Sequence, residues 1–167
     1  MASSRDLPHS LDRTQLIAAP LPEVFAFFSD PRNLGRITPP WLRPRISGPT
    51  AGGLREGSRI EYRIRWALFT LRWITRITLW QPESEFRDLQ EKGPYRSWSH
   101  THRFEPDGDG VRMRDRVEYR LPLGPLGRMI HAAIVRRQLE GIFDYRRRAI
   151  EALFSERREP DRGQVLK

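Results

Sequence analysis

The segment that decides the fold is LGRMIHAAIVRRQLEGIFDYRRRAIEALF, residues 126–154, near the C-terminus. Its apolar residues recur every three or four positions, with arginines between them, and this spacing is typical of an amphipathic helix. No proline interrupts the segment, so about eight helical turns spanning roughly 40 Å can form without a break. The turn-forming sequence LPLGPLG at residues 121–127 marks its beginning. A helix of this length needs a broad partner, and we expect a curved antiparallel sheet to wrap against it.

Alternating sequences before this helix predict the strands of that sheet. The clearest alternation is SRIEYRIRW at residues 58–66, where two isoleucines, Tyr62 and Trp66 share one face and charged residues share the other. Further strands are predicted at residues 11–19, 43–47, 69–80, 85–92, 97–105 and 111–121.

Two short helices are predicted directly after the first strand. Pro22 suits the first turn of a helix, and the apolar residues that follow form a short helix that ends at Asp30 and Pro31. A second short helix at residues 33–37 ends before Pro39, because a residue that precedes proline disfavours the helical conformation. The sequence therefore predicts one strand, two short helices, further strands and a long C-terminal helix.

The length of 167 residues suits a single domain with a sizeable core. We expect a flexible polar arm at residues 1–10, one folded domain at 11–155 and a flexible charged tail at 156–167. The chain has no cysteine, which excludes disulfide bonds and cysteine-ligated metals and suits a cytoplasmic protein. We find neither a signal-peptide pattern nor about 20 successive apolar residues, so we expect no stable insertion into a membrane.

The net charge of +9 would attract a polyanion such as nucleic acid. Only Lys92 and Lys167 among the 30 basic residues are lysines, and the arginines are scattered along every predicted element with acidic residues between them. This distribution indicates a bias of composition, and no nucleic-acid-binding motif accompanies it, so we expect no nucleic-acid partner. The basic residues on the long helix are expected on its solvated face; they are Arg136, Arg137, Arg146, Arg147 and Arg148.

Two histidines and one aspartate are predicted to meet on the inward face of the sheet. His100 and His102 are two residues apart on one strand, so their side chains point to the same side. Asp115 lies on the next strand, and the turn PDGDG at residues 106–110 predicts a register that brings it near the histidines.

Four roles are open to this cluster. It can be a satisfied buried hydrogen-bond network, or it can anchor a polar group of a mainly apolar ligand. It can also be an acid/base pair, in which Asp115 orients a histidine that moves a proton during an aldol-type cyclisation or dehydration. A facial metal triad is the fourth role, but two histidines at this spacing are common by chance in strands. We therefore expect no metal and no cofactor.

Three separated segments closely resemble a bacterial branch of the SRPBCC superfamily, which is also described as START-like or polyketide cyclase/dehydrase-like. They are PLPEVFAFFSDPRNLGRITPPWL at residues 20–42, GPYRSWSHTHRFE at 93–105 and DRVEYRLPLGPLGRM at 115–129. The resemblance covers roughly residues 11–154. It implies an α+β helix-grip fold, in which a curved antiparallel sheet, with two short helices after its first strand, packs on a long C-terminal helix.

The resemblance implies an internal cavity between the concave face of the sheet and the long helix, opening near the short helices and the hairpin loops. Trp41 is a candidate lid residue at its mouth, or it packs the short helices on the sheet. Tyr95 and Arg96 are candidates for its entrance, or they belong to an ordinary turn. The alternative, that the inward aromatic residues fill a solid core, stays open. The candidate ligand-binding residues are Tyr62, Ile64, Trp66, Trp73, Trp98, His100, His102, Asp115, Val117, Tyr119, Ile142 and Phe143.

The resemblance also implies a function. We expect the chain to bind a hydrophobic or aromatic small molecule in the cavity, with His100, His102 and Asp115 setting the orientation of the ligand. The alternative is a polyketide cyclase/dehydrase-like enzyme that uses these three residues as acid/base groups. A third hypothesis is an accessory domain that works beside an epimerase-like partner, because relatives of this branch are fused to such a domain. None of these hypotheses fixes an oligomeric state.

Overall fold

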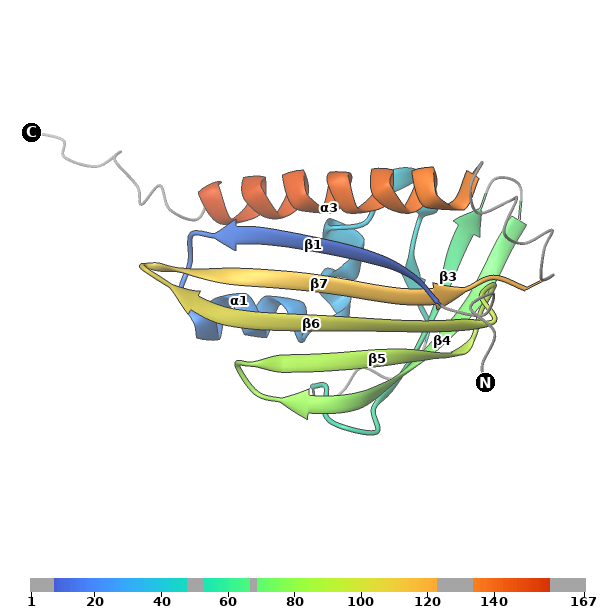
Figure 1. The fold of residues 1–167 in the computed structure, drawn as a ribbon, viewed down its shortest axis with the longest axis horizontal. Coiled ribbons are helices and arrows are strands. Elements are labelled where there is room, and N and C mark those ends of the chain that lie inside the picture. The colour runs from blue at the N-terminus through green and yellow to red at the C-terminus, as the bar shows by residue number, and fades with distance from the viewer. Residues whose placement is uncertain (1–7, 48–52, 67–68, 123–133, 157–167) are drawn as a thin grey trace, which may run out of the picture.

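The computed structural model describes residues 8–47, 53–66, 69–122 and 134–156. Within these ranges the chain forms a seven-stranded antiparallel sheet with the order β1-β7-β6-β5-β4-β3-β2, and helix α3 lies along it beside β1 (Figure 1). The strands are β1 (His9–Ile17), β2 (Arg45–Ile46), β3 (Arg59–Trp66), β4 (Phe69–Gln81), β5 (Glu85–Lys92), β6 (Ser97–Asp107) and β7 (Gly110–Arg120). The helices are α1 (Leu21–Phe28), the 3₁₀ helices η2 (Pro31–Arg36) and η3 (Pro40–Leu42), and α3 (Arg136–Glu156). This architecture confirms the predicted α+β helix-grip fold.

Helix α3 has a narrow buried stripe. It runs over 21 residues, about 32 Å of helix, and buries Leu139, Phe143, Ile150 and Phe154. The predicted helical residues 126–133 lie outside the described ranges. No helix in the described part of the chain is both long enough and apolar enough to cross a membrane.

The sheet begins earlier than predicted. His9 and Ser10 pair with Tyr119 and Glu118 of β7, so these two residues belong to β1 and not to the predicted arm. At the other end, α3 continues to Glu156, the first residue of the predicted tail. The rest of the predicted arm and tail, residues 1–7 and 157–167, lies outside the described ranges.

The short helices follow the prolines. Pro31 occupies the first turn of η2, and the carboxylate of Asp30 accepts a hydrogen bond from the backbone N–H of Arg32, which caps this helix. The helix η3 was not predicted; it starts at Pro40, because the fixed φ of proline suits a first helical position.

Strands β4 and β5 pair with two irregularities. The register shifts between Ile74 and Thr75 and again between Ile77 and Leu79. Such bulges bend a strand and increase its twist. They lie on either side of the stretch of β4 that faces Asp88, so the bend falls where the sheet curves around the candidate site.

Two apolar clusters fill most of the space between the sheet and the helices. The first surrounds α1 and the C-terminal half of α3, where Phe27 and Phe154 pack edge to face with their ring centroids 5.4 Å apart. The second surrounds the N-terminal half of α3 and contains Leu139, Phe143 and Trp73. The candidate functional site lies where these two clusters meet.

Candidate functional site

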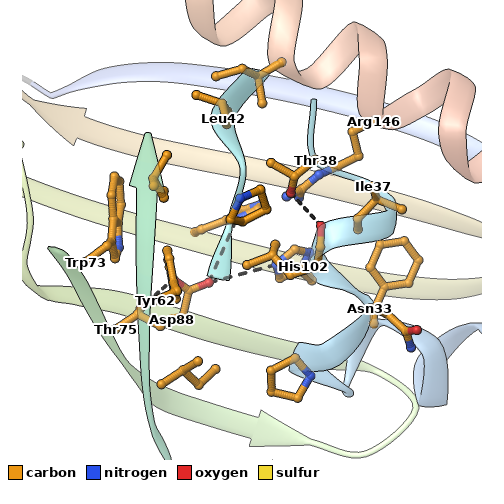
Figure 2. Close-up of a pocket in the computed structure, with 18 of the residues that line it drawn as sticks. Asn33, Ile37, Thr38, Leu42, Tyr62, Trp73, Thr75, Asp88, His102 and Arg146 are labelled. Carbon is orange, nitrogen blue, oxygen red and sulfur yellow. Dashed lines mark hydrogen bonds and ion pairs between the residues drawn. The ribbon is translucent and has the colours of Figure 1, made fainter. Parts of the chain in front are cut away.

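A cavity of about 210 Å³ lies between the sheet and α3 (Figure 2). Its walls come from β3, β4, β5 and β6, from α1 and η2, and from α3. A cavity of about 150 Å³ accepts benzene in another protein, so this volume is large enough for a small aromatic molecule. The interior is therefore hollow at this place, although two packed clusters border it.

Eight of the predicted ligand-binding residues line the cavity. Those from the sheet include the stacked pair Tyr62 and Trp73, whose ring centroids are 6.0 Å apart. Helix α3 contributes Ile142 and Phe143. The eight residues are Tyr62, Ile64, Trp73, Trp98, His100, His102, Ile142 and Phe143.

Three of the predicted residues do not line it. Asp115, Val117 and Tyr119 point inward and are buried, but they lie on β7, beyond β6, near the edge where α3 and β1 close the interior. Val117 and Tyr119 belong to the second apolar cluster, so they are packing residues. The side chain of Trp66 is not among those that the structure describes, so the prediction for this residue stays a prediction.

The structure places one of the two predicted entrance residues at the cavity and the other outside it. Tyr95 is buried and lines the cavity, whereas Arg96 is exposed and does not. Trp41 is 60% exposed and lines an outer groove, which shares Leu42 and Tyr95 with the cavity. The cavity therefore approaches the surface between η3 and Tyr95.

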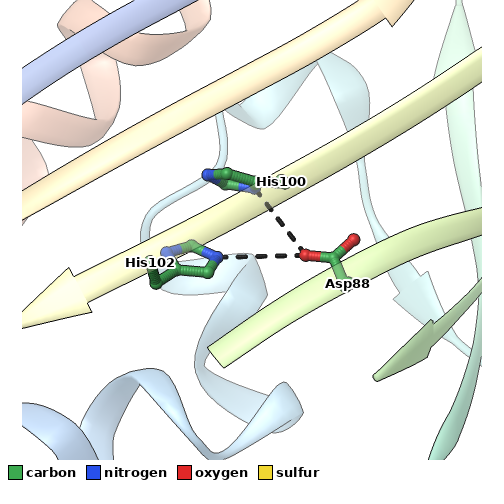
Figure 3. A group of neighbouring side chains, drawn as sticks. All are labelled: Asp88, His100 and His102. Atoms are coloured by element: carbon green, nitrogen blue, oxygen red, sulfur yellow. Dashed lines mark ion pairs between the residues drawn. The ribbon is translucent and has the colours of Figure 1, made fainter. Parts of the chain in front are cut away.

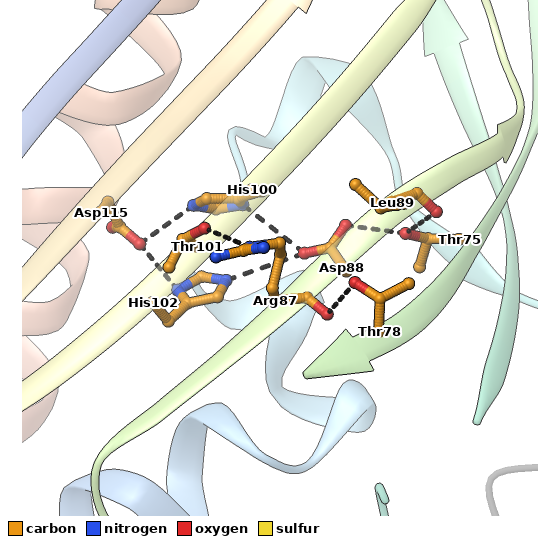
Figure 4. Close-up of polar contacts among 9 residues, drawn as sticks. All are labelled: Thr75, Thr78, Arg87, Asp88, Leu89, His100, Thr101, His102 and Asp115. Carbon is orange, nitrogen blue, oxygen red and sulfur yellow. Dashed lines mark hydrogen bonds and ion pairs between the residues drawn. The ribbon is translucent and has the colours of Figure 1, made fainter. Parts of the chain in front are cut away.

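His100, His102 and Asp115 form a compact buried cluster (Figure 4). The register pairs His102 with Asp115 directly. One carboxylate oxygen of Asp115 lies 3.0 Å from His100 Nε2, with which it makes a hydrogen bond, and 2.7 Å from His102 Nδ1. The second contact is close but lacks hydrogen-bond geometry. The three side chains are only 8% to 9% exposed.

Asp88 is the fourth member of this cluster and was not among the residues predicted from the sequence. It lies on β5 opposite His100, and its Oδ2 is 3.9 Å from His100 Nδ1 and 4.0 Å from His102 Nε2. The hydroxyl of Thr75 donates a hydrogen bond of 2.7 Å to its other oxygen. The available signal was the position of Asp88 two residues after the buried Phe86, which places both on one face of β5.

The cluster also separates the two apolar regions. The His102 ring contacts Phe28 and Phe86 of the first cluster, and the His100 ring contacts Trp98 and Phe143 of the second. Polar atoms are thus concentrated at the middle of an otherwise apolar space. This is the arrangement expected of a site that orients a ligand.

Burial and mutual contact shift the pKa values of this cluster. Burial, together with the neighbouring His100, lowers the pKa of His102 to about 4, so this imidazole is uncharged at neutral pH. Burial alone would raise the pKa of Asp115, but the close contact with His102 and the hydrogen bond from His100 hold it well below its usual range. Asp115 is therefore an anion at neutral pH.

The charge of Asp115 determines which imidazole nitrogens carry protons. A carboxylate only accepts hydrogen bonds, so the nitrogens that face Asp115 must be the protonated ones. Because His102 is uncharged, its Nε2 carries a lone pair, and both this nitrogen and His100 Nδ1 are directed toward Asp88. Asp115 acts on the cavity indirectly, by orienting these two rings.

Arg146 is a further polar residue of the cavity, and its predicted position on the helix was wrong. It was expected on the solvated face of the helix, but its side chain lines the cavity, and its guanidinium lies 5.0 Å from the centre of the Phe143 ring. Its Nε is buried and makes no hydrogen bond within the described part of the chain. The other arginines expected on that face are exposed: Arg136, Arg137, Arg147 and Arg148.

The sequence and the fold of this chain both have known relatives. A family model described as "Polyketide cyclase / dehydrase and lipid transport" matches residues 17–143. No curated protein matches the chain significantly.

Solved structures show the same fold. One is the ZhuI aromatase/cyclase from Streptomyces sp. R1128, with 16% sequence identity, a TM-score of 0.69 and coverage of 94% of this chain and 99% of that chain. A second is a norcoclaurine synthase point mutant from Thalictrum flavum in complex with a transition-state analogue, with 18% identity, a TM-score of 0.67 and coverage of 92% and 98%. A third is the ginseng major latex-like protein 151 from Panax ginseng, with 14% identity, a TM-score of 0.62 and coverage of 89% and 98%.

Proposed function

We propose that this chain, which belongs to the polyketide cyclase / dehydrase and lipid transport family, binds a hydrophobic or aromatic small molecule between its sheet and its C-terminal helix. The observation that carries the proposal is the cavity of about 210 Å³, bounded mainly by aromatic and aliphatic side chains. Small-molecule sites usually have this composition, with a few placed polar groups that fix orientation. Removal of the ligand's apolar surface from water would supply most of the affinity, at about 25 cal/mol per Å².

The polar groups of the cavity define the chemistry of the ligand. The lone pair of His102 Nε2 accepts a hydrogen bond, so it suits a hydroxyl group on the ligand, and His100 Nδ1 lies nearby as a second polar contact. The buried Nε of Arg146 donates, so it suits a carbonyl or carboxylate oxygen. The proposed ligand is therefore a small oxygenated aromatic or alicyclic molecule with most of its surface apolar.

A cavity-filling variant tests this proposal. Ile64→Trp replaces an aliphatic side chain by a bulkier indole ring at a lining position on β3 and should weaken the binding of 2-naphthol or 1-anilinonaphthalene-8-sulfonate at least tenfold. Fluorescence titration measures the affinity, and circular dichroism shows whether the variant is folded.

The matched control is Leu16→Trp, because Leu16 is 61% exposed on β1 and lies outside the cavity. It should bind both probes as the wild type does. Failure of the wild type to bind either probe, or equal binding by the folded Ile64→Trp variant, would contradict the proposal.

Cyclase or dehydrase activity is a second candidate. The observation that favours it is the pair of imidazoles that faces the cavity with Asp115 behind them. A base with a pKa of about 4, as His102 has, is poorly matched to proton abstraction at neutral pH, so ligand binding is the better-supported function. Turnover of a poly-β-ketone substrate by the wild type that is unchanged in His100→Ala, His102→Ala and Asp115→Asn would exclude acid/base roles for these residues.

A further inference from the structure

We propose that Asp88, His100 and His102 form a binding site for one divalent first-row transition-metal ion, with zinc as the ion to test first. The three side chains come from the adjacent strands β5 and β6 and converge on one point (Figure 3). One potential ligand atom of each residue lies within 4.8 Å of the other two. The site goes beyond the proposed function, because metal binding requires no organic ligand and is measured without one.

The distances suit a metal ion better than direct hydrogen bonds. Asp88 Oδ2 is 3.9 Å from His100 Nδ1 and 4.0 Å from His102 Nε2, and both distances exceed the hydrogen-bond range. Zinc binds histidine nitrogen and carboxylate oxygen at about 2.0–2.2 Å, so two ligands of a tetrahedral site are about 3.4 Å apart. For the Asp88 carboxylate, side-chain movements of about half an ångström would close the difference to each histidine.

Asp115 prepares both histidines for this role. It faces His100 Nε2 and His102 Nδ1, the ring nitrogens on the sides away from Asp88. A carboxylate at the far nitrogen of a ligating histidine fixes its tautomer and raises the basicity of the ligating nitrogen. Here one carboxylate does this for two imidazoles, and Thr75 holds Asp88 in a similar way through its other oxygen.

The buried carboxylates of the cluster also favour the binding of a cation. Within the described part of the chain, the ion-pair contacts of Asp88 and Asp115 are with the two histidines, and neither carboxylate pairs with an arginine or lysine. The side chains of Asp88 and Asp115 are only 14% and 9% exposed. Carboxylates this far from solvent, with no basic partner of this kind, are costly to bury as anions. A divalent ion between Asp88 and the histidines would supply a counter-charge.

This site differs from the metal triad considered from the sequence. That triad combined the two histidines with Asp115, whereas the structure places Asp115 behind the rings and Asp88 in front of them. Two imidazoles and one carboxylate suit zinc and its first-row neighbours better than magnesium or calcium, which prefer oxygen ligands. Since all three ligands also line the cavity, the remaining coordination position faces the space proposed for the small molecule.

The experiment uses tag-free full-length protein that has been stripped of metal with a chelator. We expect one zinc ion to bind per chain, measured by competition with a chromogenic chelator. Cobalt should bind at the same site and give visible absorption bands that report nitrogen and oxygen ligation. Absence of stoichiometric binding by the folded wild type would overturn the proposal, because a bound water or a proton would then occupy this position.

Zinc affinities of variants test whether the ion binds at the proposed residues. Asp115→Asn should weaken zinc binding about 10- to 100-fold, because it alters only the support of the ligands. Asp88→Asn and His100→Gln should each weaken it further, because each removes a ligand. His9→Gln is the control, since His9 lies on β1 outside the cluster, and it should leave the affinity unchanged. Equal zinc affinity in wild type and a folded Asp88→Asn variant would also overturn the proposal.

Discussion

Asp115 controls the residues that line the cavity although it does not line the cavity itself. It faces His100 Nε2 and His102 Nδ1, and this contact orients both rings so that His100 Nδ1 and His102 Nε2 face Asp88. The same geometry serves either a ligand hydroxyl or a metal ion. The chemistry of the site therefore depends on a carboxylate that the sequence placed correctly beside the histidines, and on a second carboxylate, Asp88, that it did not identify.

Tyr119 provides a pH prediction at the residue scale. Burial is the main cause that raises its pKa to about 12, whereas a tyrosine in the unfolded chain titrates near its ordinary value of about 10. Between these values the unfolded chain loses a proton that the native state keeps, so stability present below pH 10 is lost as the pH rises toward 12. The loss is at most about 2 kcal/mol at the upper end.

Urea unfolding at a series of alkaline pH values measures this loss. Tyr119→Phe keeps the ring and removes the titrating group, so the decline of its unfolding free energy between pH 10 and 12 should be shallower than that of the wild type. Parallel declines in the two proteins would show that Tyr119 is not the group responsible.

One stripe of helix α3 both packs in the core and borders the cavity. Leu139, Phe143, Ile150 and Phe154 are buried, and Arg146 falls between Phe143 and Ile150 at the same helical spacing. An arginine within an apolar stripe is a recognisable signal, and here it marks the part of the helix that borders the cavity. Its place beside Arg147 and Arg148, which are exposed, had predicted it on the solvated face with them.

The buried apolar residues of this stripe should account for most of the stability that α3 contributes. Ile150 is 1% exposed, so Ile150→Ala should lower the free energy of unfolding by about 3 kcal/mol through lost burial and a residual cavity. Glu151→Ala is the neighbouring control, because its side chain is 53% exposed and its ion pair with Arg147 is a surface contact. It should change the unfolding free energy by no more than about 0.5 kcal/mol. Denaturant unfolding compares the two, and similar losses would contradict this account of α3.

The strands show what alternation can and cannot predict. Alternating residues and β-favouring composition placed β3, β4, β6 and β7 within two residues of their observed bounds, because each strand has one face toward the core. Strand β5 was expected, but its charged and helix-favouring residues hid its inward face and with it Asp88. The two bulges of β4 then set which residues oppose Asp88, and a bulge has no signal in the alternation itself.

At the scale of the whole molecule, the hollow interior is the feature that the sequence left open. Aromatic residues on inward faces predict burial equally well in a solid core and around a cavity. The difference depends on how far α3 stands from the sheet, and hence on the curvature that the bulges and the second apolar cluster impose. The family supports a ligand-holding interior, and the fold supplies the space for it.

Crystals pressurised with xenon test the central claim most directly, because xenon enters apolar cavities without needing the natural ligand. The account predicts xenon density between the sheet and α3, in contact with Trp73, Ile77 and Phe143. Density confined to the surface, with side chains filling that space, would contradict it.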